Sequence, residues 1–167
     1  MSKVNVEFIA NDTSYKLEVE PRESLADSLR DKCDLTGTHL GCEHGICGAC
    51  TILINNEPVR SCLMFTVQAS GKKIRTVEGL ADGDELSIIQ KAFWNEHGLQ
   101  CGFCTPGFLM LSTWLLENEK KINKEKIKDL LSSNLCRCTG YQNILKAVET
   151  AAKEIGIWEK SEHQLDA

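Results

Sequence analysis

Apolar and polar residues alternate in the first half of the chain with the period of two that is typical of half-buried strands. Four segments are therefore predicted as strands, and two short polar segments as turns. The strands are residues 4–9, 15–19, 51–54 and 73–77, and the turns are residues 11–12 and 55–58. The first two strands and the turn between them predict a β-hairpin.

A helix is expected between this hairpin and the third strand. Ser24 can cap its N-terminus, with Asp27 at the third helical position in a start that resembles a capping box. Leu25, Leu29 and Cys33 would form its apolar face. A mixed sheet crossed by one helix predicts a small α+β domain.

The apolar period lengthens after residue 84, and the second half predicts four helices. Leu86, Ile89 and Phe93 lie at i, i+3 and i+7, and Gly98 can end this first helix. Residues 108–116 are apolar nearly all round, so the second helix should be the buried one. Four helices in about 75 residues predict a compact bundle.

Start signals mark the other three helices of this half. The second helix begins at Thr105 with Pro106 at its first position, Asn123 can cap the third, and residues 139–142 form a capping box before the fourth. Ile155 is expected to face inward near the end of the fourth helix. In an antiparallel bundle, the loop before the second helix and the loop before the fourth would meet at one end.

The short polar segment of residues 79–84 separates the strand-rich half from the helical half. We place the domain boundary there, with one domain at residues 1–78 and the other at residues 79–167. A chain of 167 residues can bury two small cores of this size. The polar tail after Trp158 is expected to fray.

The charge balance argues against nucleic acid as the main partner, because the chain has 19 basic and 24 acidic residues and a net charge of −5. The longest apolar stretch, residues 108–116, is about half of a membrane span. The N-terminus has neither an apolar core nor a cleavage site typical of a signal peptide. We therefore expect a cytoplasmic protein without a membrane span, in which cysteines serve as metal ligands and not as disulfides.

Four of the nine cysteines have the spacing of a plant-type [2Fe–2S] site. Cys42, Cys47, Cys50 and Cys62 are separated by four, two and eleven residues. Residues 41–50 include three glycines, which permit a tight loop whose backbone N–H groups point at sulfur. The spacing predicts one iron–sulfur cluster held by these four thiolates.

A second set of four cysteines lies in the helical half, where Cys101 and Cys104 form a C-x-x-C pair and Cys136 and Cys138 form a C-x-C pair. By itself this set is compatible with either an iron–sulfur cluster or zinc. Its occurrence beside the first set favours a second iron–sulfur cluster. Cys33 belongs to neither set and is interpreted as a small buried apolar residue on the helix.

Three motifs in this order resemble those of the small iron–sulfur subunit of molybdenum hydroxylases. They are GCEHGICGAC at residues 41–50, QCGFCTPG at residues 100–107 and NLCRCTGY at residues 134–141. The family includes xanthine dehydrogenases, aldehyde oxidoreductases and aerobic carbon monoxide dehydrogenases. The resemblance extends over about residues 3–157. It implies an N-terminal β-grasp, ferredoxin-like domain followed by a C-terminal four-helix bundle, each holding one [2Fe–2S] cluster.

The resemblance also implies a role for each cysteine set. Cys42, Cys47, Cys50 and Cys62 would hold the cluster nearer a flavin, and Cys101, Cys104, Cys136 and Cys138 the cluster nearer molybdenum. Gln100 and Cys138 would face the pterin, and the amide of Gln100 suits its edge of mixed donors and acceptors.

The implied function is electron transfer within a larger oxidoreductase. Electrons would pass singly from molybdopterin, of the cytosine dinucleotide type, through two [2Fe–2S] clusters to FAD. A large subunit would bind the molybdopterin and a medium subunit the FAD, in a dimer of heterotrimers. This chain would then carry no catalytic residue and no substrate pocket.

Two alternatives remain open at this point. A free-standing, two-cluster ferredoxin would use the same cysteines as a carrier, although a plant-type carrier needs no second domain. A zinc module for protein binding is disfavoured by the spacing of the first set. His44 is interpreted as an exposed loop residue, and Tyr141, Trp94, Trp114 and Trp158 as packing or interface residues.

Overall fold

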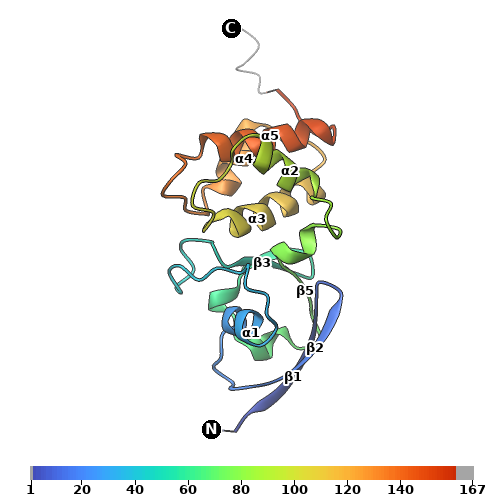
Figure 1. Cartoon of the computed structure of the whole chain (residues 1–167), viewed down its shortest axis with the longest axis vertical. Helices are drawn as coiled ribbons and strands as arrows, with labels where there is room; N and C mark the ends of the chain where they lie inside the picture. The colour runs from blue at the N-terminus through green and yellow to red at the C-terminus, as the bar shows by residue number, and fades with distance from the viewer. Residues whose placement is uncertain (1, 161–167) are drawn as a thin grey trace.

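The computed structural model of the chain describes residues 2–160 and has a sheet-containing part at one end and a helical part at the other (Figure 1). Five strands form one mixed sheet in the order β2-β1-β5-β3-β4. The strands are β1 Val4–Ala10, β2 Thr13–Val19, β3 Thr51–Ile54, β4 Glu57–Arg60 and β5 Lys73–Arg75. β1 and β5 pair in parallel, and the other pairs are antiparallel.

The predicted hairpin is confirmed, and so is its buried face. Val6, Phe8 and Ala10 point into the core with at most 3% of their surface exposed, while the residues between them are exposed. This alternation places one face of β1 against α1, Leu25–Asp31, which crosses the sheet. Ser24 caps α1 as predicted, because its side chain accepts a hydrogen bond from the Asp27 N–H at 3.1 Å.

One strand was not predicted by the sequence pattern. Residues 55–58 were interpreted as a turn, but the turn is only Asn55-Asn56, and β4 already begins at Glu57. Both asparagines have positive φ angles, 49° and 66°, as a tight two-residue hairpin turn requires. Pro58 is tolerated in β4 because this strand lies at the edge of the sheet.

Short 3-10 helices replace the other irregular segments of this part: η1 Ser61–Leu63, η2 Thr66–Ala69 and η3 Val77–Leu80. The predicted strand at residues 73–77 therefore ends two residues early, at Arg75. Asn11 accounts for this end, because its side chain accepts from the Thr76 N–H at 2.9 Å and donates to the Thr76 hydroxyl at 2.8 Å.

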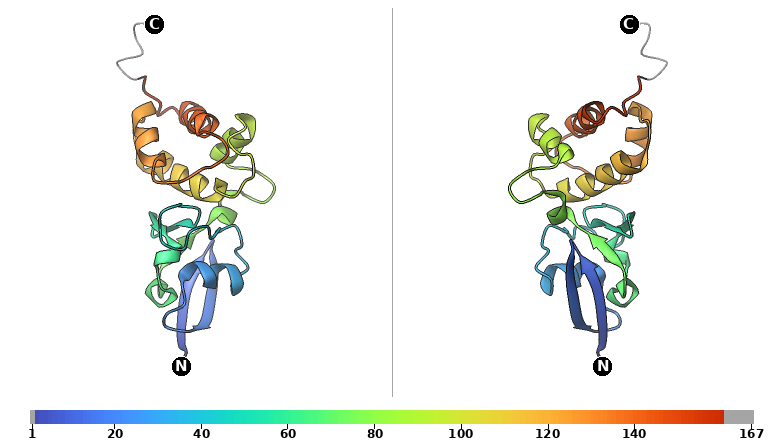
Figure 2. Two further views of the ribbon diagram at one scale, coloured as in Figure 1. Left: turned by 90° about the vertical axis from the view of Figure 1, so that its left-hand side faces the viewer. Right: turned by 90° about the vertical axis from the view of Figure 1, so that its right-hand side faces the viewer.

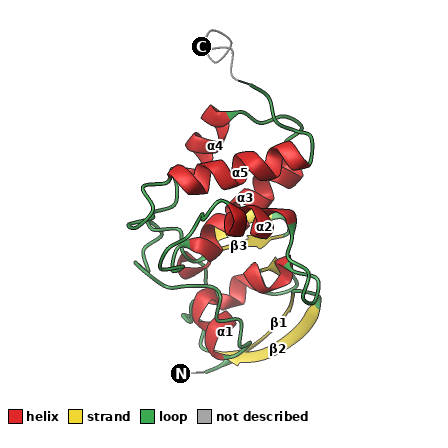
Figure 3. Ribbon diagram, turned by 45° about the horizontal axis from the view of Figure 1, so that its top comes forward, coloured by secondary structure: helices red, strands yellow, loops and turns green. Residues whose placement is uncertain are grey.

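Four helices form the other part: α2 Ile88–Asn95, α3 Thr105–Asn118, α4 Lys124–Leu131 and α5 Gln142–Glu154. α2 and α4 each contact both α3 and α5, which closes the four into a bundle (Figures 2 and 3). Pro106 lies in the first turn of α3, and Asn123 caps α4 by accepting from the Lys126 N–H at 3.0 Å. These two helix starts agree with the predictions.

Two details of the fourth helix were predicted wrongly. The capping box at residues 139–142 does not form, because α5 begins after Tyr141, which has a φ of +68° and makes no side-chain cap. The Thr139 hydroxyl instead accepts a hydrogen bond from the Tyr141 N–H. Ile155 is 37% exposed, since it is the residue at which α5 ends.

α3 is the helix that joins the two parts of the chain. It is buried against the other helices on one side and contacts β3, β4 and η3 on the other. Leu53 of β3 accordingly belongs to the core of the helical part. Arg75 of β5 also makes two hydrogen bonds, at 2.6 and 3.0 Å, with the carboxylate of Glu117 on α3. A helix packed on two sides must be apolar nearly all round, as residues 108–116 are.

None of the helices in the described part of the chain is long and apolar enough to cross a membrane.

Candidate metal centres

The first cysteine set lies in the loop between α1 and β3, together with Cys62 of η1. The Cys47 N–H donates to Cys42 Sγ at 3.3 Å. The backbone N–H groups of Cys47 and His44 lower the pKa of Cys42 to about 6. Burial raises the pKa of Cys62 to about 12, and the hydrogen bond that it shares with Cys50 adds to the shift. The four thiols therefore lie as two neighbouring pairs, Cys42 with Cys47 and Cys50 with Cys62.

Glycines leave room for a bulky group in this loop. A Cβ on Gly41 would lie 3.2 Å from Cys47 Sγ, on the side where the thiols gather. Gly48 has a φ of +73°, which a residue with a side chain rarely adopts, and its Cα lies against the side chain of Asn134. The positive φ and the close side chain of Asn134 require glycine at position 48, whereas at position 41 a side chain would crowd Cys47 Sγ.

The second cysteine set brings together two loops of the bundle. Cys104 is the residue before α3, and Cys136 and Cys138 lie between α4 and α5. Cys101 Sγ and Cys138 Sγ are 3.5 Å apart, and Cys104 shares a hydrogen bond with Cys136. The prediction that these loops meet at one end of the bundle is confirmed.

The environments of the second set differ from thiol to thiol. Burial raises the pKa of Cys104 to about 12, and the proton shared with Cys136 raises it further. For Cys136 burial acts in the same direction, but hydrogen bonds from the Thr139 hydroxyl and N–H outweigh it, so its pKa is lowered. Cys101 and Cys138 are exposed. One pair of thiols thus faces the interior and the other faces the surface.

This arrangement fits a two-iron cluster at each set. All nine cysteines are free thiols. Within residues 2–160, no group of three or more Cys, His, Asp or Glu side chains converges as the ligands of a single metal ion would. Two separate pairs of thiols match the ligands of a [2Fe–2S] cluster, in which each iron takes two thiolates.

The two cysteine-bearing loops contact each other directly, although they are far apart in the sequence. The Leu135 N–H donates to the Cys47 carbonyl at 2.9 Å, and Asn134 Nδ2 donates to the Gly48 carbonyl at 3.3 Å. Arg60 Nη2 reaches the Ser133 carbonyl at 2.7 Å. Because Cys136 follows Leu135 directly, this hydrogen bond joins the backbone of a cysteine of the first set to the residue next to a cysteine of the second.

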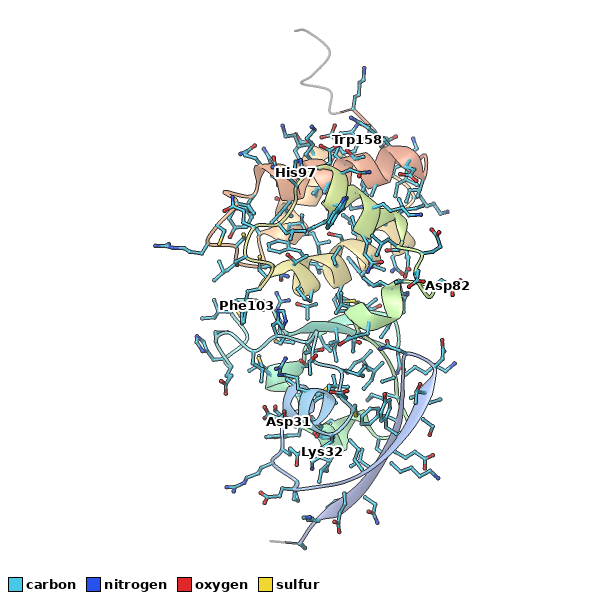
Figure 4. All side chains as sticks on the ribbon, viewed as in Figure 1. Asp31, Lys32, Asp82, His97, Phe103 and Trp158 are labelled. Carbon is cyan, nitrogen blue, oxygen red and sulfur yellow. The ribbon has the colours of Figure 1, made fainter. Side chains whose placement is uncertain are left out.

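A second contact between the two parts lies beside this one. His39 Nδ1 is 2.7 Å from the Phe103 carbonyl, and the two rings are stacked with centroids 4.9 Å apart. Figure 4 shows Phe103 where the helical part meets the sheet-containing part. His39 carries no motif signal in the sequence, because it gains its partner only in the folded chain.

Tyr141 does more than pack. Its ring lies edge-on to Phe108 with centroids 6.1 Å apart, as expected for a packing residue. Its hydroxyl also accepts a hydrogen bond from the Cys136 N–H at 2.9 Å. The positive φ of Tyr141 turns the chain back so that the ring can reach that N–H. The three tryptophans differ in exposure: Trp94 is 72% exposed, whereas Trp114 and Trp158 pack against the helical core.

The remaining predicted residues are placed as follows. Gln100 is exposed beside Cys101 on the outer side of the second set. His44 is exposed, as predicted, and its Nδ1 contacts the Cys42 carbonyl. Cys33 is 7% exposed in the core of the sheet-containing part, and burial raises its pKa to about 11. This confirms the interpretation of Cys33 as a buried apolar residue, but its predicted place on the helix is wrong, because α1 ends at Asp31 and Lys32 is its C-cap.

Two family models cover most of the chain. Residues 8–80 match the 2Fe-2S iron-sulfur cluster binding domain, and residues 76–149 match the [2Fe-2S] binding domain. Each cysteine set lies within one of these matches.

The comparisons with individual proteins agree. The caffeine dehydrogenase subunit gamma of Pseudomonas sp. (strain CBB1) is 51% identical over 91% of this chain and 93% of its own length. The nicotine 6-hydroxylase small subunit of Paenarthrobacter nicotinovorans is 53% identical over 92% and 93%. A chain of quinoline 2-oxidoreductase from Pseudomonas putida 86 superimposes with a TM-score of 0.88 at 43% identity, over 94% of this chain and 99% of that one.

These relatives are subunits of larger oxidoreductases, so the alternative of a free-standing ferredoxin is wrong. The paired thiols, the two matched domains and the fold of the relatives agree with one another. The chain belongs to the family of small [2Fe–2S] iron–sulfur subunits of the molybdenum hydroxylases.

Proposed function

We propose that this chain passes electrons singly from a molybdopterin centre on a large subunit to FAD on a medium subunit. Bound [2Fe–2S] clusters supply the one-electron storage that such a path needs. The proposed ligands of the first cluster are Cys42, Cys47, Cys50 and Cys62, and those of the second are Cys101, Cys104, Cys136 and Cys138.

The contact between the two cysteine loops carries this proposal. The hydrogen bond from the Leu135 N–H to the Cys47 carbonyl joins the loops through backbone atoms alone. Hydrogen bonds from Asn134 and Arg60 hold the same two segments together. Two thiol sets fixed this way keep a constant separation, which electron transfer between them requires.

The exposed sides of the two sets suggest where the partners bind. Cys101, Cys138 and Gln100 are exposed on the second set, and we assign this side to the pterin of the large subunit. Ile46 precedes the proposed ligand Cys47 and Leu63 follows the proposed ligand Cys62; their side chains are 60% and 62% exposed. Apolar residues exposed at this level suit a contact with the medium subunit.

The assembly that we propose is a dimer of heterotrimers in the cytoplasm, with molybdopterin of the cytosine dinucleotide type. The small subunit would consist of a cluster domain at residues 1–78 and a second one at residues 79–167. Caffeine, nicotine and quinoline, after which the relatives are named, are all nitrogen heterocycles. We propose a substrate of this class, bound by the large subunit.

The test is to purify the complex by a tag on this chain. We expect co-purification of two larger subunits, two [2Fe–2S] clusters per chain by iron analysis, and two distinct EPR signals after reduction. Addition of the substrate should bleach the visible absorbance of both clusters. Iron for a single cluster, or a chain that purifies without partners, would contradict the proposal.

A further inference from the structure

The side chain of Thr139 connects the turn before α5 to a thiol of the second set. Its Oγ1 lies 3.1 Å from Cys136 Sγ, and its backbone N–H donates to the same sulfur at 3.5 Å. The Tyr141 N–H donates to Thr139 Oγ1 at 3.1 Å. Because the oxygen already accepts this hydrogen bond, its own proton is available for the sulfur. A metal-bound thiolate has no proton to offer, so the hydroxyl must be the donor.

The direction of this hydrogen bond is held by a closed ring of contacts. Tyr141 donates through its N–H to Thr139 and accepts through its hydroxyl from the Cys136 N–H at 2.9 Å. Its ring is fixed against Phe108 of α3. Thr139 is half-buried, so water competes only partly for its hydroxyl. The Thr139 hydroxyl that donates to Cys136 is thus held in place by the backbone of the turn before α5.

We propose that the Thr139 hydroxyl sets the reduction potential of the second cluster by donating a hydrogen bond to Cys136 Sγ. This inference rests on the proposed ligand role of Cys136. Reduction adds one negative charge to the cluster, and a donor aimed at a ligand sulfur stabilises the reduced form more than the oxidised form. Thr139 therefore raises the potential of this cluster and favours the arrival of an electron there.

The first set offers an internal reference. Cys42 accepts its hydrogen bond from the backbone N–H of Cys47, which no side-chain substitution at Thr139 can remove. The potential of the first cluster should therefore stay unchanged in every Thr139 variant. A general disturbance of the protein would change both potentials.

The experiment compares Thr139→Val with Thr139→Ser in the complete complex, using an EPR-monitored redox titration. Valine keeps the shape of threonine without the hydroxyl, whereas serine keeps the hydroxyl. In Thr139→Val the reduced-to-oxidised ratio of the second cluster should fall about tenfold at a fixed solution potential, which corresponds to about 59 mV for a one-electron couple. Thr139→Ser should stay near the wild type. Electron–nuclear double resonance should show one fewer exchangeable proton coupled to the reduced cluster in Thr139→Val only.

Three results would overturn the inference. One is a Thr139→Val complex with both clusters and an unchanged second potential, and another is a Thr139→Ser complex whose potential falls as far as that of Thr139→Val. The third is loss of the second cluster in both Thr139→Val and Thr139→Ala, because Thr139 would then be needed for assembly and not for the potential. A wild-type complex without a second cluster would contradict the proposed function itself, and it is detected before any variant is made.

Discussion

Gly107 gives the sharpest test of how the two parts of the chain fit together. It lies in the first turn of α3, three residues after Cys104, and packs against the loop of the first set. A Cβ at this position would lie 2.2 Å from the Gly48 carbonyl oxygen and 3.1 Å from the Cα of Ala49. Both neighbours are backbone atoms, so no side-chain rotation can make room.

Two effects of Gly107→Ala oppose each other. Alanine favours a helix over glycine by about 1 kcal/mol, which alone would stabilise α3. Overpacking costs about 1–3 kcal/mol when the neighbours can adjust. The Gly48 carbonyl cannot adjust easily, because it accepts hydrogen bonds from the Thr51 N–H at 3.1 Å, from the Thr51 hydroxyl at 2.6 Å and from Asn134. Breaking any of them costs about 1 kcal/mol more.

The cost of overpacking and of a lost hydrogen bond exceeds the gain in helix propensity, so we expect Gly107→Ala to destabilise the protein by about 1–3 kcal/mol. For a chain of this size that lowers the melting temperature by about 2–12 °C. The assay is thermal unfolding of the purified complex, followed by the visible absorbance of the clusters. Both EPR signals should broaden, because the added methyl group must displace the backbone at Gly48 and Ala49, where the loop of the first set packs against α3 beside the second set.

Ser112→Ala is the matched control. Ser112 is buried on the same helix, and its hydroxyl has no hydrogen-bond partner among residues 2–160. Removing it should leave the melting temperature unchanged or raise it slightly. A Gly107→Ala protein as stable as this control, with unchanged EPR signals, would refute the argument that the two parts are in contact at Gly48.

Two further substitutions and one labelling experiment test the individual roles. Cys47→Ser should remove the first cluster and leave the second, because only the Cys47 carbonyl contacts Leu135; iron analysis and EPR check this, and loss of both clusters would contradict it. Gln100→Leu should keep both clusters but slow their bleaching by substrate, since a buried pterin edge would lose a hydrogen bond of about 1–3 kcal/mol; wild-type molybdenum content and rate would show that Gln100 is only a loop residue. Cys33 should resist alkylation at pH 8 in the folded protein, because burial raises its pKa to about 11 and the reactive thiolate becomes the main form only above pH 11. Rapid labelling of Cys33 at pH 8 would disprove its burial.

The sequence alone determined the cofactor and much of the local structure. Cysteine spacing is a covalent property of the chain, so the first set could be recognised before folding was considered. Helix starts such as Ser24 and Asn123 were equally accessible, because a cap bonds to an N–H only three residues away. The alternation in β1 predicted its buried face for the same local reason.

Local patterns failed where a contact that they do not encode competed with them. Residues 139–142 have the sequence of a capping box, but Thr139 is turned toward Cys136, and the positive φ of Tyr141 moves the helix start. β4 was missed because Pro58 and the two asparagines before it are turn residues by composition, and only pairing with β3 makes the segment a strand.

The tertiary structure alone decided how the two cysteine sets are connected. The hydrogen bond from Leu135 to Cys47 joins residues 88 positions apart in the sequence, and neither residue type is needed for it, because both groups belong to the backbone. The same holds for Gly107 against Gly48, where the determining feature is the lack of a side chain. Such contacts leave no periodic or compositional signal, since what they require is proximity, which exists only after α3 has packed on β3.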